Sequence, residues 1–198
     1  MASTDTSPFE TGAGQAARAL LGTTLTRTLP TGERLAGVIT ETEAYVGPED
    51  LASHAVGGRR TPRSESMWAK PGTAYVYFTY GMHHCLNVSC LRADHPAAVL
   101  IRAIRPNEGI DFMRANRAGN KPRKHPLRDR DLTNGPGKLC QALAIDLDLD
   151  GIDLLQSPHL AISGPFGAAD PDRITATPRI GLGDVGEWGE APLRFVLD

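Results

Sequence analysis

Residues 72–90 have the sequence GTAYVYFTYGMHHCLNVSC, and they constrain the fold more than any other segment of the chain. Aromatic and β-branched residues, which favour strands, lie on both sides of a turn at Tyr80–Gly81. The segment therefore predicts a β-hairpin. In its first strand, Tyr75 and Tyr77 share one face, because side chains alternate along an extended chain. A hairpin of this kind favours a largely antiparallel sheet.

Other strands and three helices are predicted around the hairpin. The strands are residues 23–29, residues 34–47, residues 97–106, which end at Pro106, and the last part of the Gly-rich C-terminal segment 179–197. The helices are residues 15–21, ended by Gly22, residues 107–117, capped by Asn107, and residues 134–145, with Pro136 in the first turn. Residues 56–66 read as a polar loop. Strands dominate and hairpins connect them, which predicts a mixed, largely antiparallel α/β (α+β) domain.

Length, charge and cysteine content narrow the class of protein. The 198 residues fit one domain, 1–198, in which we expect residues 1–11 to be flexible and a basic loop, 114–131, to be mobile. A net charge of −2 argues against bulk attraction to nucleic acid but leaves room for a local basic face. Cys85, Cys90 and Cys140 are irregularly spaced and predict buried thiols in a reducing compartment. The chain lacks an apolar run of about 20 residues and a secretory signal pattern, so we expect a cytoplasmic protein.

The stretch ITETEAYVGPEDLASHAV, residues 39–56, places acids on a predicted strand. Ile39, Glu41, Glu43 and Tyr45 have odd numbers, so an unbroken strand presents them on one face. A buried carboxylate needs a partner, and Arg102 in the apolar run VLIRAI needs one equally. Spacing alone favours a plain ion pair with Glu43 that fixes the strand register, or an Arg102 that extends to solvent. A carboxylate held by an arginine also serves as a general base for water.

Aromatic and basic residues add a second set of candidates. Tyr80 lies at the hairpin turn, where a large ring is exposed unless something covers it. Tyr45 and Tyr77 are candidates for a stacking platform and Tyr80 for a wedge, although half-buried tyrosines with wet hydroxyls are commoner. Lys138 follows NGP at a predicted helix start, where backbone N–H groups favour an anion such as phosphate. The other basic candidates are Arg59, Arg60, Arg63, Lys70 and the seven basic residues of 114–130.

The residues alone leave several functions open. His83, His84, Cys85 and Cys90 lack the spacing of a zinc site, so we expect neither a metal nor a cofactor. Glu41 and Glu43 would lie about 6.6 Å apart on a strand, near the separation of the two carboxylates in inverting glycoside hydrolases. The combination of carboxylate, arginine, aromatic platforms and basic anchors suits an enzyme that acts on a base extruded from a duplex.

Six runs that occur in order between about residues 12 and 196 closely resemble the alkyladenine (3-methyladenine) DNA glycosylase family of the mammalian type. These runs are ETEAYVGPEDLASH, GGRRTPR, KPGTAYVYFTYGMHHCLNVS, LIRAIRPNEG, LTNGPGKLCQALAI and RIGLGDVGEWGEAPLRF. The resemblance implies a single glycosylase domain with a curved sheet, a protruding hairpin and surrounding helices. It further implies a metal-independent, monomeric, monofunctional enzyme without a lyase step, acting at the nucleoid of a bacterium. Its partner is double-stranded DNA that contains alkylated or deaminated purines (3-methyladenine, 7-methylguanine, hypoxanthine or ethenoadenine), and its action starts base excision repair.

The resemblance also assigns residues. Glu43 matches the general base, Arg102 a residue that holds the attacking water, and the Ile180 carbonyl a further ligand of that water. Tyr45, His54 and Tyr77 match residues that contact the flipped base, and Asn87 one that discourages guanine. The positions expected to contact DNA are Tyr80, which fills the gap left by the base, Met82, Arg59, Thr61 and Lys138. Glu41 is expected to have a structural or supporting role.

Three positions depart from the mammalian pattern. His83 stands beside the wedge where mammalian members carry an aromatic residue, and Ala69 and Gly137 replace bulkier or hydroxyl-bearing residues. These differences bear on substrate range and affinity. A DNA-binding module of the same fold without catalysis stays an alternative, although the presence of both Glu43 and Arg102 argues against it.

Overall fold

The computed structural model describes residues 7–118, 125 and 127–198. Its strands are β1 (Thr24–Thr28), β2 (Arg34–Tyr45), β3 (Ala74–Thr79), β4 (His83–Cys90), β5 (Ala97–Glu108), β6 (Leu160–Ser163), β7 (Ile174–Thr177) and β8 (Arg194–Leu197). Its α-helices are α1 (Ala13–Leu20), α2 (Ile110–Ala118), α3 (Pro136–Ala142) and α4 (Glu187–Glu190). The 3-10 helices are η1 (Pro8–Glu10), η2 (Val56–Gly58), η3 (Pro62–Trp68), η4 (Asp129–Asp131), η5 (Leu147–Leu149) and η6 (Pro171–Arg173).

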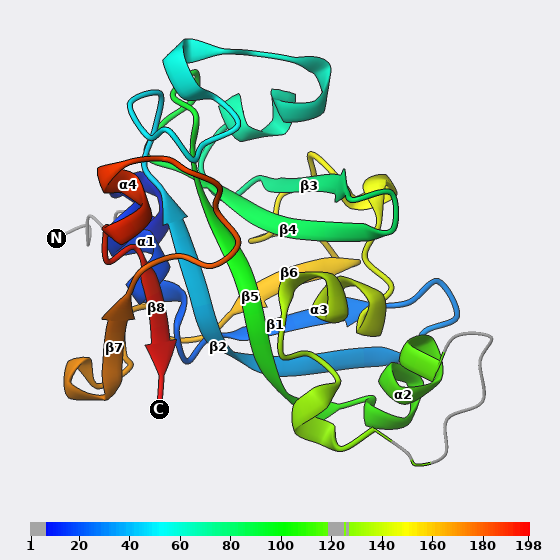
Figure 1. The fold of residues 1–198 in the computed structure, drawn as a ribbon. Coiled ribbons are helices and arrows are strands. Elements are labelled where there is room, and N and C mark those ends of the chain that lie inside the picture. Colours follow the sequence, from blue (N-terminus) through cyan, green and yellow to red (C-terminus); the bar gives the residue numbers. More distant parts are fainter. Residues whose placement is uncertain (1–6, 119–124, 126) are drawn as a thin grey trace, which may run out of the picture.

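The strands form one eight-stranded sheet in the order β3-β4-β5-β2-β1-β6, with β8 paired to β2 and to β7. Every strand pair given for the described residues is antiparallel, so the predicted fold class is confirmed. The long strands β2 and β5 run side by side through the centre of the molecule, and β8 joins one end of β2 (Figure 1). The partners of β2 therefore change along its length, from β1 near its start to β8 at Glu41–Glu43.

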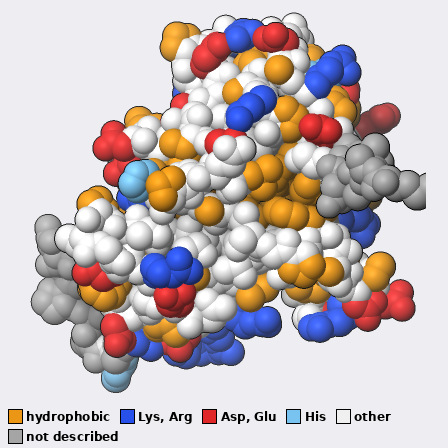
Figure 2. All heavy atoms as spheres, turned by 180° about the vertical axis from the view of Figure 1, so that it is seen from behind, with side chains coloured by type: hydrophobic (Ala, Val, Ile, Leu, Met, Phe, Trp, Pro, Cys, Tyr) orange, Lys and Arg blue, Asp and Glu red, His pale blue; other side chains and the backbone are white. Residues whose placement is uncertain are grey.

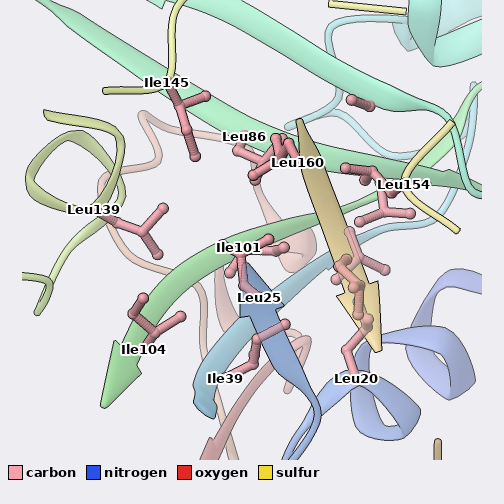
Figure 3. Close-up of a cluster of buried hydrophobic side chains, with 14 of the residues drawn as sticks. Leu20, Leu25, Ile39, Leu86, Ile101, Ile104, Leu139, Ile145, Leu154 and Leu160 are labelled. Carbon is pink, nitrogen blue, oxygen red and sulfur yellow. The ribbon is translucent and has the colours of Figure 1, made fainter. Parts of the chain in front are cut away.

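The main core lies between the sheet and the helices that cover it. α1 packs on β2 and β5, and α3 packs on β4 and β5. Figure 3 shows aliphatic side chains from these helices and strands, from β1 and β6 and from the segments before and after η5, converging in one cluster. The labelled members are Leu20, Leu25, Ile39, Leu86, Ile101, Ile104, Leu139, Ile145, Leu154 and Leu160. Since burial of each such side chain contributes roughly 1.5–3 kcal/mol, this cluster stabilises the packing of β2 and β5.

Two irregularities in the β2–β5 pairing decide which side chains face the core. Ile39 pairs with Ile104, Glu41 with Ala103, and Thr42 with Ile101, so Thr40 and Arg102 are each an extra residue in their strand. Bulges of this kind redirect side chains. Ile39 joins the main core together with Ala44. The prediction that Ile39 shares a face with Glu41, Glu43 and Tyr45 is therefore wrong, because the extra residue reverses the alternation.

The hairpin β3–β4 forms as predicted, with Tyr80 and Gly81 at its tip. Both have positive φ, +52° and +66°, as a tight turn between twisted strands requires. Tyr75 faces a small second cluster with Tyr77, while Val76 points into the main core. The predicted division of the strand into two faces is thereby confirmed.

Two local predictions are wrong. Asn107 does not cap a helix, because β5 continues to Glu108, where it still pairs with β2, and α2 begins only at Ile110. Gly109 makes the connection with a φ of +71°, and a Cβ there would lie 2.4 Å from the Arg34 carbonyl oxygen. The polar loop 56–66 is partly helical, since it contains η2 and the first turns of η3, where Thr61 and Ser64 form a capping box.

Candidate active site

One cavity of about 490 Å³ lies where β2, β3, β4 and β5 meet the loop that follows β2 and the loop that precedes α4. It is lined by all of the predicted catalytic and base-contacting residues and by the predicted wedge. These residues are Glu43, Arg102, Tyr45, His54, Tyr77, Asn87, Ile180 and Tyr80. Side chains separated by up to 137 positions in the sequence therefore converge on one space. The volume is in the range of small-molecule sites, about 300–1,000 Å³.

Glu43 is the fully buried carboxylate of this cavity, with a side-chain exposure of 0%. Its Oε1 lies 3.1 Å from Arg102 Nη1 and accepts a hydrogen bond of 2.8 Å from the Ile180 main-chain N–H. Its Oε2 accepts a hydrogen bond of 3.1 Å from the Tyr45 hydroxyl. Burial, followed by the charge of Glu43, raises the pKa of Tyr45, so the hydroxyl stays a donor. Two hydrogen-bond donors and one ion pair thus fix this carboxylate at the cavity wall.

Ile180 contributes through a different main-chain group from the one that was predicted. Its N–H contacts Glu43, whereas the sequence resemblance assigned its carbonyl oxygen to a water ligand. The carbonyl assignment stays a prediction. The Ile180 side chain is 50% exposed at the cavity, beside Gly181, whose φ of +79° turns the chain there.

Arg102 contacts two carboxylates. Its Nε donates a hydrogen bond of 2.8 Å to Glu41 Oε1, while its Nη1 lies 3.1 Å from Glu43. Burial lowers the pKa of Arg102, but the charges of Glu43 and Glu41 and the hydrogen bond to Glu41 outweigh burial and raise it. The predicted pair with Glu43 is present, and Glu41 is an additional partner that the sequence did not identify.

Sequence reasoning missed a buried ion pair between Asp50 and Arg179. Their closest atoms are 2.6 Å apart, both side chains have 0% exposure, and a second hydrogen bond of 2.9 Å makes the pair bidentate. Arg179 also donates to the Ala44 carbonyl, and its guanidinium lies 4.7 Å from the centroid of the Tyr45 ring. The pair therefore supports the Tyr45 ring. The available signal was that both residues lie inside runs that match the family.

His54, Tyr75 and Tyr77 form an aromatic wall. His54 Nδ1 and the Tyr75 hydroxyl are 2.7 Å apart, and the His54 and Tyr77 rings meet edge to face at 4.6 Å. Burial and then the charge of Arg63 lower the pKa of His54, so its ring is neutral at pH 7. Asn87 is 3% exposed, and its side-chain amide donates to the Tyr75 carbonyl at 3.0 Å. The wall and Asn87 are thus fixed by their own hydrogen bonds before anything enters the cavity.

The residues expected to contact DNA lie outside the cavity, apart from Tyr80 at its edge. Tyr80 is 81% exposed and Met82 69% exposed at the hairpin tip. Arg59 and Thr61 line a second cavity of about 240 Å³ that shares His54 with the first. Lys138 is exposed near the start of α3, and its ammonium donates to the Asn134 side chain at 2.9 Å. Tyr80, Met82, Arg59 and Lys138 are thus exposed and Thr61 is half-buried, and their roles stay predictions.

Many of the other basic candidates are paired with acids. Arg60 contacts Glu65 and Asp94, Lys70 contacts Asp153, Arg114 contacts Asp111 and Asp129, and Arg128 contacts Asp131. The predicted basic loop 114–131 falls in part outside the described residues. On the face seen in Figure 2, basic and acidic side chains are interspersed.

The three cysteines and His83 are the remaining residues that the sequence singled out. Cys85, Cys90 and Cys140 are buried and free, as predicted, and Cys85 lines the main cavity. The imidazole of His83 packs so closely on Gly137 that an added Cβ would lie 3.0 Å from the ring.

Among residues 7–118, 125 and 127–198 there is no group of three or more His, Cys, Asp or Glu placed to hold a metal ion. Within the same residues, no helix has the length and apolarity needed to cross a membrane.

Comparison with known proteins identifies similar sequences. The family described as "Methylpurine-DNA glycosylase (MPG)" matches residues 7–198. The DNA-3-methyladenine glycosylase of Mus musculus is 50% identical over 194 residues, which cover 96% of this chain and 57% of the mouse protein. The enzyme of the same name from Homo sapiens is 47% identical over 192 residues, which cover 96% of this chain and 63% of the human protein. A protein of Desulfitobacterium hafniense is 43% identical over 185 residues, covering 92% of this chain and 88% of that protein.

Proposed function

The chain belongs to the methylpurine-DNA glycosylase family, and from this premise we propose that it is a DNA glycosylase that removes damaged purines from double-stranded DNA. It spans 57–63% of the length of the mouse and human relatives, so the proposal concerns the portion that they share with it. The reaction is hydrolysis of the N-glycosidic bond, which starts base excision repair.

The observation that carries the proposal is the position of Glu43. A carboxylate with no exposed side-chain surface lines a cavity and is oriented by Arg102 and the Ile180 N–H. In the proposed reaction, Glu43 accepts a proton from water while the water oxygen bonds to C1′ of the flipped nucleotide. The electrons of the N-glycosidic bond leave with the purine. Holding the base and the nucleophile in this way contributes to the rate by orientation.

Two tyrosines on the cavity wall suit a purine ring. Tyr45 and Tyr77 both line the cavity, and an aromatic ring stacks favourably on a base by about 1–3 kcal/mol. Alkylation at N3 or N7 makes a purine cationic, which improves stacking on an electron-rich ring and makes the base a better leaving group. The proposed substrates are accordingly 3-methyladenine and 7-methylguanine, together with the neutral lesions hypoxanthine and ethenoadenine. Asn87 on the cavity wall is the proposed discriminator against guanine.

The hairpin tip supplies the means of extrusion. Tyr80 is an exposed aromatic side chain that lines the cavity, and Met82, two residues further along the hairpin tip, is also exposed. Insertion of an apolar side chain into a base stack compensates part of the few kcal/mol lost when a nucleotide leaves the duplex. We therefore assign Tyr80 to the gap in the duplex. Arg59, Thr61 and Lys138 are assigned to the phosphates around it.

Single-turnover base release tests this proposal. Wild-type protein and Glu43→Gln are incubated with duplexes that contain 7-methylguanine or hypoxanthine, in the presence of a chelator. We expect release by the wild type, a loss of at least about 100-fold in Glu43→Gln, in line with the contribution of a general base, and retained binding of damaged DNA. If both proteins bind damaged DNA and neither releases a base, the chain is a lesion-binding module and the proposal of an enzyme is wrong. If Glu43→Gln keeps full activity, Glu43 is only a structural partner of Arg102.

A further inference from the structure

Glu41 is the centre of a charge network behind the cavity. Its Oε1 accepts one hydrogen bond of 2.8 Å from Arg102 Nε and another of 2.6 Å from Arg194 Nε. Arg194 in turn donates from Nη1 to the Thr177 hydroxyl at 3.0 Å. The side chains of Glu41, Arg102 and Arg194 are only 17%, 11% and 22% exposed. The network therefore connects β7 and β8 to Arg102 through one carboxylate oxygen.

The network meets the strands where their pairing is irregular. Arg102 is the extra residue of the bulge in β5, between Ala103 and Ile101, and Glu41 pairs with Val196 of β8 on its other side. A bulge frees the Arg102 side chain from the regular alternation but does not by itself set its direction. The hydrogen bond from Nε to Glu41 supplies that direction, because a guanidinium is a rigid plane.

Two fixed points determine how this plane lies. Nε donates to Glu41, and Nη1 lies 3.1 Å from Glu43 Oε1 in an ion pair. Within the described part of the chain, no protein acceptor is found for Arg102 Nη2, and Arg102 lines the cavity. The Arg102 guanidinium thus has Nη1 beside the Glu43 carboxylate and leaves Nη2 without a protein acceptor in the described part of the chain. Without the contact at Nε, the guanidinium rotates about a single remaining contact.

We propose that Glu41 is a positioning residue for the glycosylase reaction: through Arg102 it holds the guanidinium in the orientation that serves Glu43 and the attacking water. This inference rests on the proposed function. Arg194 neutralises the second negative charge, so that Glu41 orients Arg102 without leaving an excess of negative charge beside Glu43. The four groups Glu41, Glu43, Arg102 and Arg194 carry two negative and two positive charges.

A simpler explanation is that Glu41 only joins β2, β5 and β8 to one another. The two explanations differ in what a conservative substitution changes. Glu41→Gln keeps an oxygen that accepts hydrogen bonds from both arginines but removes the charge. A purely structural role then changes thermal stability alone. A positioning role changes the rate of base release and its dependence on pH.

The experiment measures single-turnover release of 7-methylguanine between pH 4.5 and 9 for the wild type, Glu41→Gln and Glu41→Ala. The matched control is Glu108→Gln, which removes the exposed ion pair with Arg34 between the same two strands, away from the cavity. We expect a rate about 100-fold lower for Glu41→Ala, as is typical when a catalytic group is misplaced, and a smaller loss for Glu41→Gln. Because Glu41→Gln removes a negative charge near Glu43, we expect the acidic limb of its rate–pH profile to lie about one pH unit below that of the wild type.

The control is expected to match the wild type in rate and profile, and all variants to bind damaged DNA equally well. Circular dichroism and thermal unfolding establish that each variant is folded at the assay temperature. If folded Glu41→Gln and Glu41→Ala release base at the wild-type rate with an unshifted profile, Glu41 is a structural ion-pair partner and the inference is wrong. Failure of the wild type to release any base overturns the proposed function instead, and the inference with it.

Discussion

Asp50→Asn is the substitution whose effect on stability follows most directly from the structure. Asp50 and Arg179 are both completely buried, and their bidentate pair places one negative charge against one positive charge. Asparagine has nearly the same shape, and its one oxygen can still accept from one of the two N–H groups that Asp50 now satisfies, Val46 on Oδ2 or Ala52 on Oδ1. The change therefore removes the charge with little change in packing. Arg179 is left as a buried cation without its partner.

The expected loss is large relative to the stability of a domain. Removing one partner of a buried pair typically costs about 3–5 kcal/mol, against a total of about 5–15 kcal/mol for native proteins. For a chain of this size, each kcal/mol lowers the thermal midpoint by roughly 2–4 °C, so we expect a decrease of about 6–20 °C. The Tyr45 ring loses the ordered guanidinium beside it, so base release should also slow.

Urea unfolding followed by circular dichroism measures the effect, with Asp153→Asn as the control. Asp153 also pairs with a cation, Lys70, at 2.7 Å, but the lysine is 64% exposed, and such pairs contribute about 0–1 kcal/mol. Arg179→Met and the double variant Asp50→Asn/Arg179→Met complete a double-mutant cycle. The double variant should be more stable than the sum of the two single effects predicts. An Asp50→Asn protein within about 1 kcal/mol of the Asp153→Asn control would refute the reasoning.

Two further substitutions test the hairpin tip and the aromatic wall. Tyr80→Ala is placed in the Glu43→Gln background so that no base is released. It should weaken binding to a lesion-containing duplex by about 10- to 100-fold, because one stacked ring is lost. The thermal midpoint should stay constant, because Tyr80 is 81% exposed. Equal lesion binding with and without the ring would exclude a wedge. The lowered pKa of His54 makes the folded protein bind fewer protons than the unfolded chain, so stability is full above the ordinary pKa of 6.5 and falls as pH drops below it. In urea unfolding, the decrease in the free energy of unfolding from pH 8 to pH 5 should be smaller for His54→Asn than for the wild type. If the two proteins differ by the same free energy at both pH values, that assignment is contradicted.

Local sequence determined most of the secondary structure. The hairpin around Tyr80–Gly81, the helix that begins at Pro136 and the long strand that carries Glu43 all follow from propensities and turn residues within a few positions. The same local patterns suggested that Glu43 and Arg102 require partners, because a charge in an apolar strand is costly when unpaired. The resemblance to a family then selected which residues to consider together, and the structure shows those of the cavity lining one space.

Tertiary structure decided which partners these charges have. Nothing local indicates that Thr40 and Arg102 are extra residues in their strands, since a bulge depends on the pairing of two strands that are far apart in the sequence. Arg179 reaches Asp50 across 129 positions, and Arg194 reaches Glu41 across 153. Likewise, Asn107 has the side chain of a helix cap but lies in β5, because its neighbours Pro106 and Glu108 pair with β2 and this pairing outweighs its local preference. The sequence by itself determined the strands and the need for ion pairs, whereas the choice of each pair depended on contacts that exist only once the sheet has closed around the cavity.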